Sequence, residues 1–143
     1  MVIAAWRDEY CTGHAVIDAQ HRHLFDLVNR VHWLLSNGPG EGNGETWDLL
    51  REFAQCAQEH FALEEQLMAD YDYPHVEMHC KTHQRLVDKV ARVLDPDTAV
   101  DLTPEAVTQV LADWMVHHIK GEDQRMIRYF QAQETFQAQP SLV

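Results

Sequence analysis

Histidine is frequent in this chain of 143 residues, which holds ten histidines against eleven lysines and arginines together. Histidine is the side chain that most often binds metal ions in proteins. Five of the histidines and one glutamate lie where the residues three and four positions away are largely apolar, as on the buried face of a helix. They are His21, His60, Glu64, His79, His83 and His118. Burying so many polar groups is costly unless they find partners or hold a metal ion.

Two pairs of these side chains are spaced to act together. His60 and Glu64 are four residues apart, as are His79 and His83, so each pair projects from one side of a helix. A hydrogen bond inside the core would explain any single buried histidine, but separate partners for the whole set would require many further internal polar groups. Imidazole nitrogens and carboxylate oxygens suit iron, zinc, copper or manganese, and no cysteine is placed to compete. We therefore predict a metal centre.

A second carboxylate ligand is left open between two neighbouring residues. Glu122 follows His118 by four residues and Asp123 follows it by five. Gly121 can loosen the helix at this point, so helical spacing does not decide which acid faces inward.

Four other histidines have the surroundings of surface or boundary residues. His23 shares its helix face with Asp26, and His117 lies near Asp113. We expect both to point outward. His32 occupies a boundary position, and His75 stands at the start of a helix.

Four amphipathic stretches carry the predicted ligands. Apolar residues recur at alternating steps of three and four, which is the period of a helix with one buried face. The stretches cover about residues 17–35, 53–67, 76–93 and 103–118. Glycine and proline interrupt the pattern between them, and Thr103 followed by Pro104 is typical of a helix start.

These stretches predict an all-α fold. Short connections make neighbouring helices antiparallel, so we expect an up-down-up-down four-helix bundle preceded by an extended N-terminal segment. Residues 1–131 are assigned to this domain. The polar residues 132–143 lack an apolar stripe and are interpreted as a C-terminal tail or the start of a linker, and residues 37–44 are interpreted as a flexible connection.

Composition excludes several classes of function. The formal net charge of -12 would repel nucleic acid and anionic membrane surfaces. No apolar run approaches the roughly 18 residues that a membrane-spanning helix needs. Three cysteines without close spacing favour a reduced compartment, so we expect a cytoplasmic protein with no nucleic-acid or membrane partner.

Over about residues 6–130, the chain resembles the bacterial hemerythrin-like domains of the hemerythrin family. The matching segments are Ile17-Asp18-Ala19-Gln20-His21 with Leu24-Phe25, His60-Phe61-Ala62-Leu63-Glu64-Glu65-Gln66-Leu67-Met68, Tyr73-Pro74 leading to His79-x-x-x-His83, and Trp114-Met115-x-x-His118-Ile119 followed by Asp123. The resemblance selects Asp123 as the second carboxylate, because the last ligand of the family stands five residues after its histidine.

The resemblance implies a centre of two iron ions joined by a bridging oxo or hydroxo group. One iron would be held by His79, His83 and His118, and the other by His21 and His60. Glu64 and Asp123 would bridge them. Two octahedral irons with this ligand set keep one position open, on the iron of His21 and His60, and the family binds dioxygen there. An apolar oxygen pocket around it would be formed by Leu24, Phe61, Trp114, Met115 and Ile119.

The function expected from this resemblance is reversible dioxygen binding by a carrier or storage protein that is not an enzyme. The alternative is an oxygen- or redox-sensing input domain with a fused or partner signalling domain. A di-iron oxidase, or a reductase of peroxide or nitric oxide, is less favoured because the chain lacks two Glu-x-x-His pairs. A mononuclear zinc site is also disfavoured, since the ligands outnumber the four that zinc usually takes.

Two residues depart from the pattern of the family. His14 stands where an aliphatic residue is usual, and three roles are open for it: a group behind a ligand, a gate near the pocket, or a surface histidine. Met115 replaces a leucine, and its thioether can be oxidised.

Overall fold

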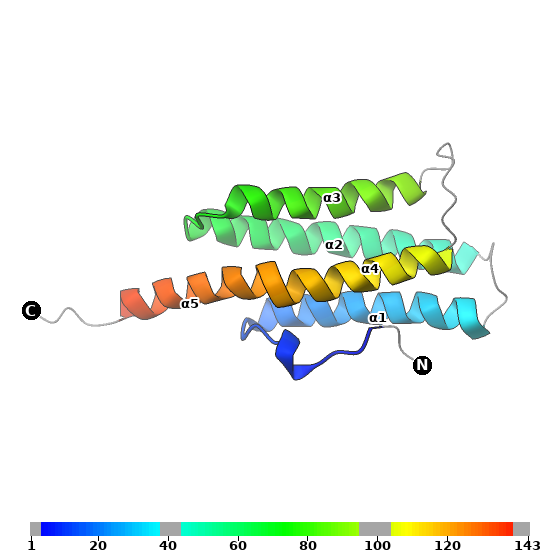
Figure 1. The fold of residues 1–143 in the computed structure, drawn as a ribbon, viewed down its shortest axis with the longest axis horizontal. Coiled ribbons are helices and arrows are strands. Elements are labelled where there is room, and N and C mark those ends of the chain that lie inside the picture. Colours follow the sequence, from blue (N-terminus) through cyan, green and yellow to red (C-terminus); the bar gives the residue numbers. More distant parts are fainter. Residues whose placement is uncertain (1–3, 38–43, 95–103, 139–143) are drawn as a thin grey trace, which may run out of the picture.

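The computed structural model describes residues 4–37, 44–94 and 104–138, and Figure 1 shows this part as a bundle of long helices. The helices are α1 (Ala15–Asn37), α2 (Gly44–Asp70), α3 (Val76–Leu94), α4 (Pro104–His118) and α5 (Gln124–Ala138), with a π-helical turn, η2 (Ile119–Asp123), between the last two. No strand occurs among the described residues. The prediction of an all-α helical bundle is therefore confirmed. The predicted connections at 38–43 and 95–103, with the cap at Thr103, lie outside the described residues.

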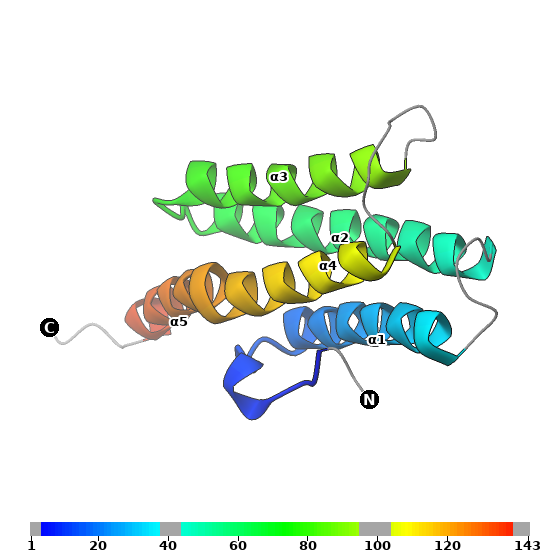
Figure 2. The same ribbon diagram turned by 45° about the vertical axis from the view of Figure 1, so that its right-hand side comes forward.

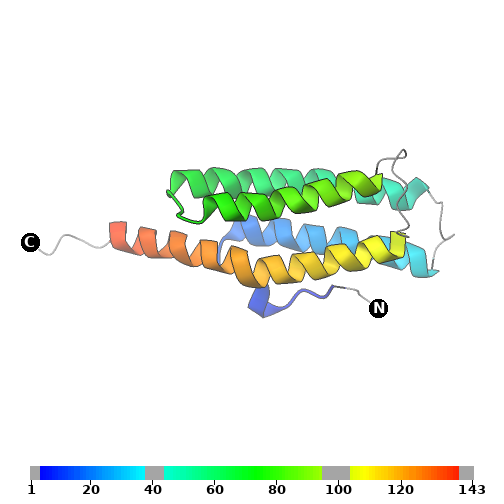
Figure 3. The same ribbon diagram turned by 45° about the horizontal axis from the view of Figure 1, so that its top comes forward.

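The fourth rod of the bundle is made of α4, η2 and α5 joined end to end. Figure 3 shows them as one continuous helical rod whose α5 end projects past the ends of the other helices. Its last described turns therefore have few neighbours to pack against, which agrees with the missing apolar stripe beyond Phe130. The interpretation of residues 132–143 as a tail or linker stays a prediction.

The helices do not pack equally closely against one another. α1 lies against α2 and α4, and α2 lies against α3, whereas α3 makes little contact with α4. A pocket of about 430 Å³ opens between α3 and α4, lined by side chains from both. The bundle is therefore tight on three sides and looser on the fourth.

The core consists of two apolar clusters with a polar layer between them. The larger cluster includes Leu24, Phe53 and Leu111, and the smaller one includes Ile17, Met68 and Met126. Along every helical rod the predicted ligands fall between residues of the two clusters. This order places apolar material on both sides of the polar layer, which limits its contact with water.

The N-terminal segment runs along the outside of α1, as Figure 2 shows. It includes one short 3-10 turn, η1 (Asp8–Tyr10). Trp6, Tyr10 and Phe25 of α1 pack together, with each pair of ring centroids 5.6–5.7 Å apart. The carboxylate of Asp18 accepts hydrogen bonds from the amide and hydroxyl of Thr12 at 2.9 and 2.8 Å. These contacts tie the segment to the helix that carries His21.

Within the described residues, no helix is both long and apolar enough to cross a membrane. The cytoplasmic location stays a prediction.

Candidate metal centre

The seven predicted ligands converge in the middle of the bundle, and none is more than 4% exposed. They form two overlapping groups in which the possible ligand atoms lie within 4.8 Å of one another. The first group is Glu64, His79, His83, His118 and Asp123, and the second is His21, His60, Glu64 and Asp123. The structure thus divides the five histidines into the sets of three and two that the resemblance implies.

The Glu64 carboxylate is shared between the two groups. Its Oε1 is 3.0 Å from Nε2 of His83 and 3.4 Å from Nε2 of His79. Its other oxygen, Oε2, is 2.9 Å from Nε2 of His60 and 3.7 Å from Nε2 of His21. One oxygen therefore faces the set of three histidines, and the other faces the set of two.

The Asp123 carboxylate is divided in the same way. Its Oδ1 is 3.0 Å from Nε2 of His118 and 3.1 Å from Nε2 of His79. Its Oδ2 is 3.0 Å from Nε2 of His21. Ligand atoms bonded to one metal ion at about 2.0–2.2 Å lie about 3 Å from each other, so these separations fit two metal positions with both carboxylates between them.

Most of the inward-facing atoms have no hydrogen-bond partner in the part of the chain that the structure describes. They include Nε2 of His21, His60 and His79, and both oxygens of Glu64 and Asp123. The atoms approach one another at ion-pair distances but not in a hydrogen-bonding arrangement. Buried polar groups left in this state cost several kcal/mol, on the order of the stability of a whole domain. Bound cations would satisfy all of them at once.

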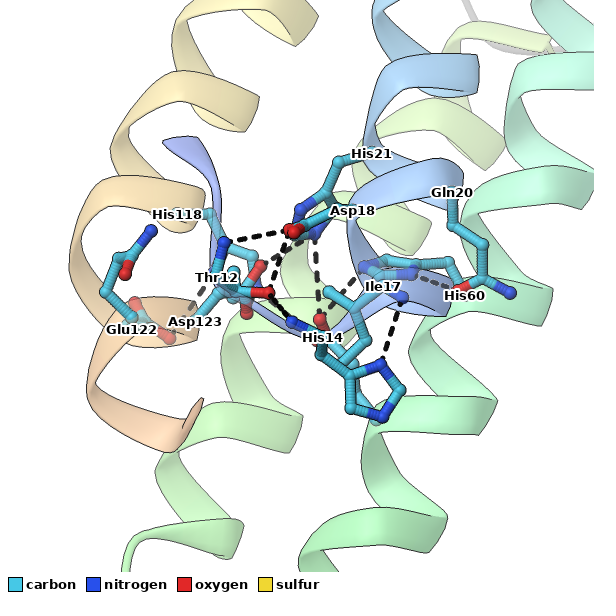
Figure 4. Close-up of polar contacts among 12 residues, drawn as sticks. Thr12, His14, Ile17, Asp18, Gln20, His21, His60, His118, Glu122 and Asp123 are labelled. Carbon is cyan, nitrogen blue, oxygen red and sulfur yellow. Dashed lines mark hydrogen bonds and ion pairs between the residues drawn. The ribbon is translucent and has the colours of Figure 1, made fainter. Parts of the chain in front are cut away.

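The π-helical turn η2 explains why Asp123 rather than Glu122 faces the centre. Its wider turn makes bonds to the fifth residue along, so Asp123 comes into line with His118. Asp123 is fully buried. The Glu122 side chain is 38% exposed, and its carboxylate lies 3.5 Å from Nδ1 of His118, on the far side of that ring from the centre. Figure 4 shows the three residues together.

Three polar residues behind the ligands were not predicted. Nδ1 of His60 lies 2.6 Å from Oε1 of Gln20, so this nitrogen donates the hydrogen bond and Nε2 stays free to bind a metal, as Figure 4 shows. Glu122 stands behind His118, and Oε1 of Glu65 is 3.9 Å from Nδ1 of His83. Gln20 and Glu65 occur in the motifs that carry the resemblance, but spacing alone does not show which ligand each one reaches.

The two carboxylates are ionised in this setting. Burial would raise the pKa of Asp123, and the charge of Glu64 acts in the same direction, but His118 and His21 outweigh both and hold that pKa far below its usual range. Burial would also raise the pKa of Glu64, but His60, His21 and His79 lower it well below its ordinary value. Two negative charges are therefore available to hold cations.

The histidines respond to these two carboxylates. Burial alone would lower each histidine pKa, yet Asp123 and Glu64 raise the pKa of His21 to about 9, that of His79 to about 9 and that of His118 to about 10. Burial dominates at His83, whose pKa is lowered. Without a metal, protons occupy part of the centre, so metal binding has to displace them.

Aromatic rings cover the set of three histidines. Phe61 stacks on His83 with centroids 3.9 Å apart, and Trp114 stacks on His118 at 4.4 Å. Phe61 also lies 5.9 Å from the ring of His60. Phe61 and Trp114, the two aromatic members of the predicted oxygen pocket, therefore lie against the set of three histidines. The position expected to remain open is the other one, that of His21 and His60, and Phe61 also approaches this position through His60. The other members, Leu24, Met115 and Ile119, are buried in the larger apolar cluster. Their role as an oxygen pocket stays a prediction.

The remaining histidines lie away from the centre. His23 and His117 are exposed, as predicted, His75 is exposed too, and His32 is half-buried at the boundary. His14 immediately precedes α1, and its Nδ1 accepts a hydrogen bond of 3.3 Å from the amide of Ile17, as Figure 4 shows. The ring thus caps a helix, and the three roles left open for His14 stay predictions.

The fold and the centre define a class: an all-α bundle metalloprotein with a buried layer of histidines and carboxylates. Residues 12–130 match the family model described as the hemerythrin HHE cation binding domain. The chain belongs to the hemerythrin family, and this membership implies that it binds non-haem iron.

Named relatives cover most of the chain. It is 32% identical to a bacteriohemerythrin of Stenotrophomonas maltophilia over 87% of its own length and 79% of the relative. It is 27% identical to a bacteriohemerythrin of Pseudomonas aeruginosa over 86% and 78% of the two chains. For a bacteriohemerythrin of Campylobacter jejuni the identity is 25%, over 81% and 86%.

Proposed function

We propose that this chain binds two iron ions in the centre and uses them to bind dioxygen reversibly, as a carrier or store. The observation that carries the proposal is the division of each carboxylate: Glu64 and Asp123 both turn one oxygen to the set of three histidines and the other to the set of two. A single metal ion would leave one oxygen of each carboxylate unused. Two iron ions, when bound, supply the electrons that reversible dioxygen binding needs.

The chain supplies unequal sets of ligands to the two metal positions. Three histidine nitrogens face one position and two face the other, while both carboxylates serve both. The position of His21 and His60 is therefore one protein ligand short, and we assign the dioxygen site to it. The apolar clusters on both sides keep water from the layer, and exclusion of water and protons favours reversible binding over further reaction.

The donor set also supports binding without catalysis. Five neutral nitrogen ligands with two carboxylates differ from the carboxylate-rich sites of di-iron enzymes, where a Glu-x-x-His pair comes from each of two helices. We propose that the protein is not an enzyme. Substantial turnover of peroxide or nitric oxide beyond that of free iron would contradict this.

The test combines metal analysis with a spectrum. The purified protein is expected to hold two irons per chain, and the reduced form to develop a ligand-to-metal charge-transfer band in oxygen that disappears when the oxygen is removed. A single metal per chain, or a reduced protein with two irons and no oxygen-dependent band, would overturn the proposal.

One observation favours sensing as a second candidate. The rod that carries His118 and Asp123 continues as α5 past the other helices, as Figure 1 shows, so a change at the ligands has a direct helical connection to the surface. A fused or partner signalling domain would be the receiver. Hydrogen exchange of α5 is expected to differ between reduced and oxidised iron-loaded protein if the chain senses, and to be the same in both if it only carries oxygen.

A further inference from the structure

We propose that divalent metal ions reach the centre through the seam between α3 and the α4–η2 segment, and that Glu122 binds them in transit. The inference rests on the metal centre of the proposed function. The ligands themselves are at most 4% exposed, so an ion from solvent has to reach them by way of other side chains that are partly exposed. Partly exposed polar side chains that adjoin the ligands lie along this seam.

Two hollows meet at this seam. The pocket of about 430 Å³ between α3 and α4 has His118 in its wall. A second pocket, of about 210 Å³, lies between the start of α3 and the η2–α5 segment, and His79 is part of its wall. Thr82 and Glu122 line both pockets. Each hollow therefore leads from solvent to a buried ligand, and the two hollows share a carboxylate and a hydroxyl.

Glu122 is placed and charged to bind a cation at this junction. Its side chain is 38% exposed, and its carboxylate lies 3.5 Å from Nδ1 of His118. That nitrogen is buried and has no hydrogen-bond partner within the described residues. A partly exposed carboxylate therefore stands directly outside a buried nitrogen that makes no hydrogen bond to the described residues.

The chemistry of the seam suits a metal ion better than dioxygen. Carboxylate, hydroxyl and imidazole groups are oxygen and nitrogen donors for a ferrous ion. Dioxygen is uncharged and apolar, so it gains nothing from Glu122. Lys89 and Arg125 each line one of the hollows, but the acid is the charged group common to both. The net charge of -12 also draws cations towards the protein.

The test measures the rate of iron loading rather than dioxygen binding. Iron-free protein is mixed anaerobically with ferrous sulfate, and tryptophan fluorescence is followed, because Trp114 stacks on His118 and its emission will report iron there. Glu122→Gln is expected to slow loading about five- to tenfold, near the lower limit of electrostatic steering. Release to a strong chelator should slow by a similar factor, since a transit ligand lowers the barrier in both directions. The iron content after equilibration should match that of the unaltered chain.

Glu77→Gln is the control. Glu77 lies on α3, its side chain is 85% exposed, its carboxylate lies 4.0 Å from Nζ of Lys81, and it lines neither hollow. It should load at the unaltered rate. Added salt should slow loading of the unaltered chain more than that of Glu122→Gln.

Three results would overturn the transit role. They are unaltered loading in Glu122→Gln, equal slowing in Glu77→Gln, or faster iron release in Glu122→Gln, which would make Glu122 a residue that only orients His118. Failure of the unaltered chain to bind iron at equilibrium would instead contradict the proposed function itself.

Discussion

Asp123 lies five residues after His118, yet its Oδ1 is 3.0 Å from Nε2 of that histidine, because the π-helical turn η2 brings the fifth residue into line. Glu122, the fourth residue, is left on the outer side. Two adjacent acids of the same charge therefore differ in position. Their isosteric amide variants separate the two positions experimentally.

Asp123→Asn is expected to remove iron from the centre, whereas Glu122→Gln is expected to keep it. The aspartate oxygens face both sets of histidines, so the loss should exceed the 10–100-fold that is typical of residues behind a ligand. Iron analysis after dialysis against a chelator measures the difference. Equal iron contents in the two variants would show that η2 does not select the ligand.

Gln20→Leu should weaken iron binding at the position of His21 and His60 by about 10–100-fold. The Gln20 side chain accepts a hydrogen bond from His60 and thereby leaves Nε2 of that ring free. Gln20→Glu keeps an acceptor and should restore binding. Release of iron to a chelator measures the effect, with one kinetic phase expected for each of the two irons. Gln84→Leu, which removes an exposed amide paired with Asp88, serves as the control.

The iron-free protein should lose stability as the pH rises above neutrality. The folded pKa values of about 9, 9 and 10 at His21, His79 and His118 lie above the ordinary value of 6.5. The stability that these histidines contribute is therefore fully present below pH 6.5 and lost as the pH passes through about 9 to 10. His83, with its lowered pKa, acts in the opposite direction.

The melting temperature of iron-free protein, measured from pH 6 to 10, checks this pH dependence. It should fall across that range. Iron-loaded protein should change less, because the metal has already displaced the protons. A flat profile for the iron-free protein would contradict the charge pairing at the centre.

His14→Ala should lower the free energy of unfolding by about 0.5–1 kcal/mol without changing the iron content. The ring accepts a hydrogen bond from the amide of Ile17 at the start of α1, and alanine cannot. His14→Asn, which supplies an efficient cap, should restore stability. Urea denaturation measures the change, and a loss of iron or a faster reaction with oxygen in His14→Ala would show instead that His14 acts on the centre.

Periodicity was sufficient to predict α1 to α4 and the inward side of each, but it did not predict α5. His21, His60, Glu64, His79, His83 and His118 all proved to be buried, because a residue's place on a helix face follows directly from the regular turn of the α-helix. The motifs then indicated the family, which the family model and the relatives show independently.

The second carboxylate depended on an irregular turn. Helical spacing could not choose between Glu122 and Asp123, since a π-helical turn depends on packing around it as well as on local sequence. The resemblance named Asp123, and the structure supplied the physical reason.

Other features depend on contacts between helices that are distant in the sequence. The division of each carboxylate between two sets of histidines requires all four rods in place. The hydrogen bond from His60 to Gln20, the stacking of Phe61 on His83 and the loose seam along α3 likewise involve separate rods. A one-dimensional pattern predicts which face a residue occupies, but the atom it meets across the core is decided only when the helices pack.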